Sequence, residues 1–248
     1  MASTSETVSF KEVLRAHPRG EPLGIAALKR LGVTPYRASA LARSGWLDHL
    51  ARGVYMLPGD KLSRDGSLAF LSEQVLGLHV GSKTALAWRG VRQNIAFRET
   101  LTLWGDRAKP LPTWFTERFP ARYQATQLFE DKLPPGLGLQ PLPNGDARVL
   151  VSVPERAVLE LLSDVGKTQS LSEARELVEG LQSLRPKVLD ELLTHTTRIK
   201  VVRAAASLAH ELSLPWAALA KQHSQRIGGG ERWIAVSKTG ERLDFKKS

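Results

Sequence analysis

The pattern of apolar and polar positions at the start of the chain predicts three short helices. Residues 9–12 (SFKE) fit a capping box, and the apolar stripe after them predicts a helix of about two turns. Residues 25–31 carry apolar side chains at helical spacing and are followed by Gly32. Thr34 is a favourable N-cap and Pro35 a favourable first helical residue, so a third helix begins about three residues after the second ends. Two short helices joined by so tight a turn are typical of a helix-turn-helix.

Within the third helix, the side chains divide into two faces. At about 100° per residue, Ala38, Leu41 and Ala42 gather on one side, which predicts the buried face. The opposite side therefore combines an aromatic ring, a hydroxyl group and guanidinium groups, with no acid. Its residues are Tyr36, Ser39, Ala40 and Arg43, with Arg37 at the flank.

A short hairpin is expected directly after the third helix. Residues 46–50 and 54–57 read as strands on either side of Ala51-Arg52-Gly53, which places Arg52 at the tip. Three helices followed by a hairpin is the order of elements in a winged helix. Four residues of the hairpin are expected to pack against the first and third helices rather than to form an exposed aromatic patch: Trp46, Leu47, Val54 and Tyr55.

The rest of the chain predicts a larger, mixed domain. Helical and strand patterns do not alternate regularly, which favours an α+β fold over a doubly wound sheet. The stretch 58–60 (PGD) marks a boundary, so we expect a winged helix-turn-helix DNA-binding domain at 1–60 and an α+β domain at 61–248. A second capping box, at 152–155, is expected to open a helix. Helices are expected at 67–78, 82–89, 156–162, 171–184, 186–195 and 198–212, strands at 97–104, 123–129 and 147–152, and a terminal hairpin at 232–245.

The composition adds a strong positive charge. The chain has 248 residues, with 35 Lys and Arg against 25 Asp and Glu, a net charge of +10 and a pI near 10.1. This balance favours polyanionic partners, chiefly nucleic acid, although charge alone leaves open a basic protein without such a partner. The absence of cysteine excludes disulfides, thiolate catalysis and cysteine-based zinc sites, and it suits a reducing cytoplasm. With no signal-peptide pattern and no apolar stretch of about 20 residues, a cytoplasmic protein without membrane contact is expected.

The motifs of common enzyme chemistry are missing from the sequence. A phosphate-binding loop needs GxxxxGK[ST], but residues 161–168 lack the first glycine and residues 77–84 have the wrong spacing. No two histidines have metal-ligand spacing, and no GxSxG nucleophile elbow occurs. The adjacent carboxylates at 130–131 and 190–191 read as solvated surface. We therefore expect no catalytic residue, no metal site and no cofactor, and a protein that is not an enzyme.

The exposed face of the third helix is the candidate DNA contact. In a helix-turn-helix, the second helix enters the major groove with its N-terminal residues at the base edges. The Arg37 guanidinium can donate two hydrogen bonds to guanine O6 and N7 or contact a phosphate. Thr34, at the start of the helix, suits a phosphate contact. Arg52 at the wing tip suits a minor groove or the backbone. The alternative is a winged helix that binds protein through the same face. The predicted DNA-binding residues are Thr34, Tyr36, Arg37, Ser39, Arg43 and Arg52.

A second basic surface is expected in the larger domain. This surface could contact further DNA beyond the winged helix, a toxin, an RNA, or only solvent, and the sequence does not decide between these alternatives. The residues of this predicted second surface are Lys83, Arg89, Arg92, Lys200 and Arg203.

Four segments of the chain resemble, in the same order, the AbiEi antitoxins of bacterial type IV toxin–antitoxin systems. Each segment alone is weakly specific, but four in order over most of the chain are fairly specific. They are SGWLDHLARGVYMLPGD (44–60), LHVGSKTALAWRGV (78–91), PLPTWF (110–115) with VPERAVLELL (153–162), and LRPKVLDELL (184–193) with RIKVVRAAASLAHELSLPW (198–216).

The resemblance implies a DNA-binding antitoxin. Its N-terminal winged helix would repress the antitoxin–toxin operon by binding double-stranded DNA at promoter inverted repeats. Its C-terminal domain would counteract an AbiEii-like nucleotidyltransferase toxin, with no need for stable contact between the two proteins. Two alternatives stay open: a stand-alone transcriptional regulator without a toxin partner, and a nucleic-acid-modifying enzyme whose catalytic residues the sequence does not reveal.

Overall fold

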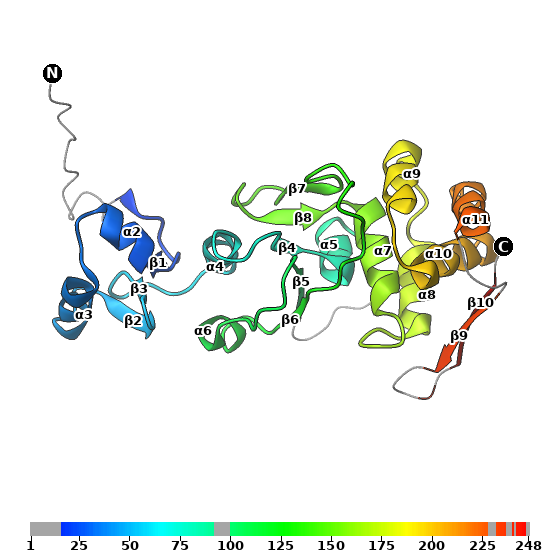
Figure 1. Cartoon of the computed structure of the whole chain (residues 1–248). Helices are drawn as coiled ribbons and strands as arrows, with labels where there is room; N and C mark the ends of the chain where they lie inside the picture. Colours follow the sequence, from blue (N-terminus) through cyan, green and yellow to red (C-terminus); the bar gives the residue numbers. More distant parts are fainter. Residues whose placement is uncertain (1–15, 92–99, 228–231, 237–239, 241, 247–248) are drawn as a thin grey trace, which may run out of the picture.

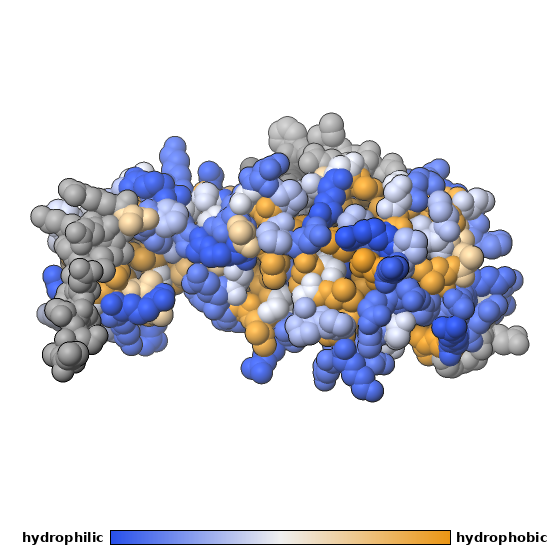
Figure 2. Space-filling model, turned by 90° about the horizontal axis from the view of Figure 1, so that it is seen from above, coloured by the Kyte–Doolittle hydropathy of each residue, from blue (hydrophilic) through white to orange (hydrophobic). Residues whose placement is uncertain are grey.

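The computed structural model describes residues 16–91, 100–227, 232–236, 240 and 242–246, and it shows an elongated molecule (Figure 1). A small N-terminal unit lies at one end, with helix α3 (Pro35–Arg43) opposite helix α11 (Ala217–Arg226) at the other. A narrower waist joins this unit to a larger one (Figure 2). Within the described residues, no helix is both long enough and apolar enough to cross a membrane.

The N-terminal unit has the order of elements of a winged helix. Its three-stranded antiparallel sheet has the order β1-β3-β2. The helix expected after residues 9–12 lies outside the described residues. The sequence did not predict strand β1, which is only two residues long. The elements are β1 (Leu23–Gly24), α2 (Ile25–Arg30), α3 (Pro35–Arg43), β2 (Asp48–Ala51) and β3 (Val54–Met56).

Local hydrogen bonds set both ends of α3. The Thr34 hydroxyl accepts the Arg37 amide N–H at 3.2 Å, and Pro35 is the first helical residue, which confirms the predicted start. Gly45, at φ 78°, takes the left-handed conformation that ends many helices. The Trp46 amide then donates to a carbonyl in the last turns of α3 at 2.9 Å. The helix therefore begins and ends at positions that the sequence marks.

A small apolar core holds the N-terminal unit together. Two hairpin residues, Leu47 and Tyr55, lie in it as predicted, but Val54 packs with Leu50 against the core of the larger unit. Trp46 is 58 % exposed. The predicted packing is therefore wrong for Trp46 and Val54, because the hairpin contacts two cores and the Gly45 turn leaves Trp46 in solvent. The small core consists of Leu23, Leu28, Val33, Ala38, Leu47, Tyr55 and Leu57.

The larger unit contains a mixed five-stranded sheet with the order β6-β5-β4-β8-β7. The pairs β4–β8 and β5–β6 are parallel, whereas β4–β5 and β7–β8 are antiparallel. The sheet is mixed, and helices α7–α11 all follow its last strand in the sequence, which confirms the predicted α+β class. The sequence did not predict β4 and β7. The strands are β4 (His79–Val80), β5 (Leu101–Trp104), β6 (Ala121–Gln124), β7 (Leu139–Pro141) and β8 (Leu150–Ser152).

The helices of the larger unit continue beyond the sheet towards the C-terminus (Figure 1). Helix α7 is buried on nearly all sides and contacts α5, α9 and α10. Three consecutive alanines of α10, at 204–206, are fully buried, so neighbouring helices approach this segment closely. The predicted helices are present, but α7 is longer than expected, α4 begins and ends earlier, and the others are shorter. The sequence did not predict α6 and α11. The helices are α4 (Arg64–Ser72), α5 (Ser82–Trp88), α6 (Thr113–Thr116), α7 (Pro154–Asp164), α8 (Leu171–Glu179), α9 (Pro186–Thr194), α10 (Ile199–Glu211) and α11 (Ala217–Arg226).

The chain ends in the predicted hairpin, formed by β9 (Arg232–Val236) and β10 (Arg242–Lys246). Leu243 and Phe245 of β10 are buried in the main core, and the hairpin contacts α10. Apolar side chains on one face of β10 therefore attach the hairpin to the helices.

A buried carboxylate joins the sheet to the helices. Glu160 of α7 accepts hydrogen bonds from His79 Nε2 and from the Ser82 amide, both at 2.9 Å. The Ser152 hydroxyl and Arg156 Nε also donate to it at 2.9 Å. Burial acts to raise the pKa of Glu160, but the charges and hydrogen bonds of its partners hold that pKa below its usual value. The ionised carboxylate thus links four elements of the fold.

The predicted capping box at 152–155 is wrong. Val153 occupies the N-cap position of α7 and makes no side-chain hydrogen bond. The Ser152 hydroxyl donates to Glu160, and Glu155 binds Arg185 at 2.9 Å. Because both polar side chains have charged partners elsewhere in the fold, they do not form the reciprocal pair of a capping box.

Ionic and apolar contacts join the two units at a seam. Arg148, in the loop before β8, donates through its two terminal nitrogens to Glu21 of the N-terminal unit, at 2.9 and 2.5 Å. The carboxylates of Glu21 and Asp146 raise the pKa of Arg148 above its usual value. Leu50 and Val54 supply the apolar side of the seam. The winged helix is therefore held against the larger unit in a defined orientation.

Candidate nucleic-acid interface

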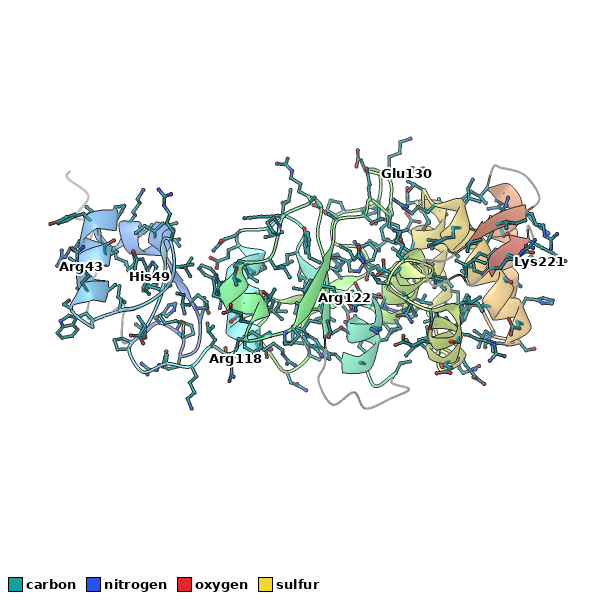
Figure 3. The ribbon with its side chains drawn as sticks, turned by 90° about the horizontal axis from the view of Figure 1, so that it is seen from below. Arg43, His49, Arg118, Arg122, Glu130 and Lys221 are labelled. Atoms are coloured by element: carbon teal, nitrogen blue, oxygen red, sulfur yellow. The ribbon has the colours of Figure 1, made fainter. Side chains whose placement is uncertain are left out.

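Helix α3 presents the predicted basic and aromatic side chains to solvent. Ala38 is fully buried against the small core, which fixes the side of the helix that faces outward. Tyr36 is 80 % exposed. Arg43, labelled in Figure 3, lies at the N-terminal end of the molecule. These exposed residues, called the α3 face below, are Thr34, Tyr36, Arg37, Ser39 and Arg43.

The charges of the N-terminal unit are unbalanced at its surface. Glu21 binds Arg148 and Asp60 binds Arg19, so these two acids are already neutralised. Asp48 is exposed and accepts a backbone amide at 3.3 Å. Guanidinium groups without ion pairs suit the phosphates of nucleic acid. The basic side chains that form no ion pair with any described residue are Lys29, Arg30, Arg37, Arg43 and Arg52.

The wing of this winged helix is short. Strands β2 and β3 are joined by Arg52 and Gly53 alone, with Gly53 at φ 74°. The Gly53 carbonyl accepts the Ile25 amide at 2.8 Å, so the turn is tied to the start of α2. Arg52 is exposed at the tip, as the sequence predicts. A rigid turn therefore carries a guanidinium group that forms no ion pair with any described residue.

The predicted second surface needs correction at most of its positions. Lys83 pairs with Glu173 at 3.1 Å. Arg89 is half-buried and donates to two carbonyls of β8, at 2.9 and 3.4 Å, and burial lowers its pKa. Arg92 lies outside the described residues. Lys83 and Arg89 are thus engaged in internal contacts between elements.

The two α10 residues of the predicted second surface are also engaged inside the fold. Arg203 is 1 % exposed. Lys200 donates to the carbonyls of Ser163 and Val165, at 2.7 and 2.8 Å, and burial lowers its pKa to about 8. The prediction is wrong here because α10 packs against both α7 and α11, which covers the face expected in solvent.

Other basic side chains of the larger unit are exposed. Arg118 follows α6 and Arg122 lies in β6, an edge strand of the sheet; both are labelled in Figure 3. Nothing in the sequence distinguishes these two residues from Arg89, because exposure here depends on the order of strands in the sheet. In the N-terminal unit, Arg37 and Arg43 share the exposed α3 face, and neither forms an ion pair with a described residue.

A cavity of about 610 Å³ lies beside the end of β5. His79 and Arg156 line it, but both already bind Glu160. Trp104 and Phe129 form apolar walls, with the Arg156 guanidinium 4.9 Å from the centre of the Phe129 ring. Among the residues that the structure describes, no cluster of acids and histidines fits a metal ion. The contacts of His79 and Arg156 beside this cavity therefore join elements of the fold.

Comparison with known structures identifies a shared fold. The chain is similar to the crystal structure of the RV2827C protein from Mycobacterium tuberculosis, with a TM-score of 0.56 and 16 % sequence identity. The similarity covers 91 % of this chain and 86 % of that chain. At this identity the likeness supports the fold alone. No curated protein matches the chain.

Two family models together match nearly the whole chain. One, described as the N-terminal domain of the AbiEi antitoxin, a transcriptional regulator, matches residues 6–97. The other, described as a transcriptional regulator, the AbiEi antitoxin of a type IV toxin–antitoxin system, matches residues 98–246. They confirm the resemblance seen in the sequence. The chain belongs to the AbiEi family of transcriptional regulators, the antitoxins of type IV toxin–antitoxin systems.

Proposed function

We propose that this protein represses its own operon by binding inverted repeats in the promoter through the α3 face. The observation that carries the proposal is the exposed, acid-free surface of α3, with Arg37 and Arg43 unpaired among the described residues. In this arrangement α3 enters the major groove and its first turn faces the base edges. Arg37, one turn from the capped helix start, reads a guanine or holds a phosphate.

The proposal divides the chain into a DNA-binding domain at 1–60 and an antitoxin domain at 61–248. The two separate apolar cores support this division, because the small core draws only on residues 23–57. The wing supports the DNA-binding role, since Arg52 at its tip adds a further basic side chain without an ion pair to those of α3. Arg118 and Arg122 belong to the antitoxin domain in this scheme.

The full-length protein is expected to form a specific complex with an inverted repeat in its own promoter. Several phosphate contacts by arginine and lysine release counterions, so the affinity should fall by about 10³-fold or more between 50 and 200 mM salt. Fluorescence anisotropy with the promoter duplex and a shuffled duplex of equal length measures both properties. Equal affinity for the two duplexes would contradict repression through a specific operator.

We further propose that the antitoxin domain counteracts a nucleotidyltransferase toxin in the cytoplasm. A full-length Arg37→Ala/Arg43→Ala variant, expressed from an unrelated promoter, should still rescue growth of cells that express the toxin. The reason is that both residues belong to α3, which lies at the opposite end of the molecule from α9–α11 (Figure 1). Growth curves with the wild type as the control measure the rescue.

Loss of rescue by this variant, while it remains folded, would show that DNA binding and toxin control are not separable. A nucleotidyltransferase gene next to that of the antitoxin favours the antitoxin role. Without such a gene, the stand-alone regulator is the better account.

A further inference from the structure

Trp46 is a large aromatic side chain that the fold holds in solvent. Its neighbour Leu47 is 1 % exposed and belongs to the small core, whereas Trp46 is 58 % exposed. The backbone at this point is fixed, because the Trp46 amide donates to the Leu41 carbonyl at 2.9 Å and Gly45 takes the left-handed conformation. The indole is therefore presented by a rigid turn and not by a loose loop.

The position of Trp46 relative to α3 suggests its partner. Helix α3 has nine residues and is about 13 Å long, close to the width of about 12 Å of a B-DNA major groove. When the first turn of α3 faces the base edges, the C-terminal end of a helix of this length lies towards the rim of the groove, near a phosphate strand. Trp46 follows the C-terminal end of α3, three residues after Arg43. It is thus placed beside a sugar–phosphate strand when α3 lies in the groove.

The charge around Trp46 favours DNA over a protein partner. Single exposed apolar side chains are common on protein surfaces, so exposure alone does not indicate a contact. Here Trp46 follows Arg43 by three residues in the sequence. Among the described residues of this unit, five lysines and arginines form no ion pair, whereas Asp48 is the one acid without an ion pair. Such a surface attracts phosphates and suits an indole that can pack on deoxyribose and donate its N–H to a phosphate.

We propose that Trp46 contacts the sugar–phosphate backbone of duplex DNA at the C-terminal end of α3, a role that rests on the proposed function of the winged helix. The contact adds affinity without reading sequence, because every nucleotide presents the same sugar and phosphate. It also carries no charge and releases no counterion. Trp46 therefore differs from the arginines of the α3 face in a measurable way.

Tryptophan emission tests the contact directly. Full-length wild-type protein titrated with the promoter duplex should show a change in emission that Trp46→Phe largely removes. Trp88→Phe is the matched control, since Trp88 lies in the larger unit with the Arg64 guanidinium 4.3 Å from its ring centre. That variant should retain the change. A change retained in Trp46→Phe would overturn the proposal.

Affinity and its salt dependence provide the second test. Trp46→Ala should weaken binding by about tenfold for both the promoter and the shuffled duplex, as expected from burial of about half an indole. The slope of log affinity against log salt should be unchanged. Leu76→Ala, which alters a 68 % exposed side chain of the larger unit, should bind as the wild type does. Thermal denaturation checks that each variant is folded.

The outcomes separate this inference from the proposed function. If the wild type binds the duplex, and Arg37→Ala/Arg43→Ala weakens it while Trp46→Ala does not, only the role of Trp46 is wrong. If Trp46→Ala instead changes self-association and leaves DNA binding intact, Trp46 is a protein contact and the proposal is overturned. If the wild type binds neither duplex, both proposals fail.

Discussion

Replacing Glu160 by Gln is expected to lower the free energy of unfolding by about 3–5 kcal/mol. The variant keeps the shape of the side chain but removes the negative charge that faces His79 and Arg156. A buried charge that loses its partner is costly, and the Gln amide also adds donors next to the existing donors. Urea denaturation followed by circular dichroism measures the loss.

The same carboxylate makes the stability depend on pH. In the folded protein the pKa of Glu160 lies below the ordinary value of 4.5. Its contribution is therefore complete above about pH 5 and is lost as the pH falls below 4.5 through the folded pKa. The difference in unfolding free energy between the wild type and Glu160→Gln should shrink over that range.

Glu173→Gln is the matched control for this prediction. Glu173 forms an ion pair with Lys83 at 3.1 Å, but its side chain is 41 % exposed. Solvent screens such a pair, so the change should cost less than about 1 kcal/mol. Equal effects of Glu160→Gln and Glu173→Gln would contradict the role given to the buried carboxylate.

The double variant Arg37→Ala/Arg43→Ala is expected to weaken the promoter complex by about 100-fold or more. In the proposed complex each guanidinium group supplies a base or phosphate contact, and a lost phosphate contact lowers the salt slope by about 0.9. The slope should therefore fall by about one to two units. Anisotropy titrations at several salt concentrations measure both the affinity and the slope.

The control removes the same charge from the far end of the molecule. Lys221 and Arg226 are exposed on α11, and Figure 3 shows Lys221 and Arg43 at opposite ends. Lys221→Ala/Arg226→Ala should leave the complex almost unchanged. If both double variants weaken binding equally, net charge and not the α3 face governs DNA binding.

The sequence predicted the N-terminal unit well because its signals are local. Thr34, Pro35 and Gly45 set the ends of α3 through bonds within a few residues, and the structure confirms them. The α+β class followed from the irregular order of helices and strands. The place of the candidate DNA contacts on α3 followed from its 3.6-residue period, while their role in binding stays a prediction.

Errors arose where burial depends on distant segments. Lys200 and Arg203 fit the polar face of an isolated helix, but α7 and α11 cover α10 from both sides. The sequence around Ser152 matches a capping box, but in the structure the Ser152 hydroxyl donates a hydrogen bond to Glu160, two turns along α7. Trp46 fits a packed hairpin because an apolar pattern does not show which of two adjacent residues faces the core.

The elongated shape bears on whether the proposed DNA contact and a proposed protein contact can occur together. A duplex held by α3 is separated from α9–α11 by the length of the molecule (Figure 1). A protein bound to those helices does not compete with DNA by steric overlap. Any coupling between the binding of the two ligands must therefore pass through the seam, where Glu21 and Arg148 meet. The coupling free energy depends on how strongly each ligand favours one orientation of the two units over another.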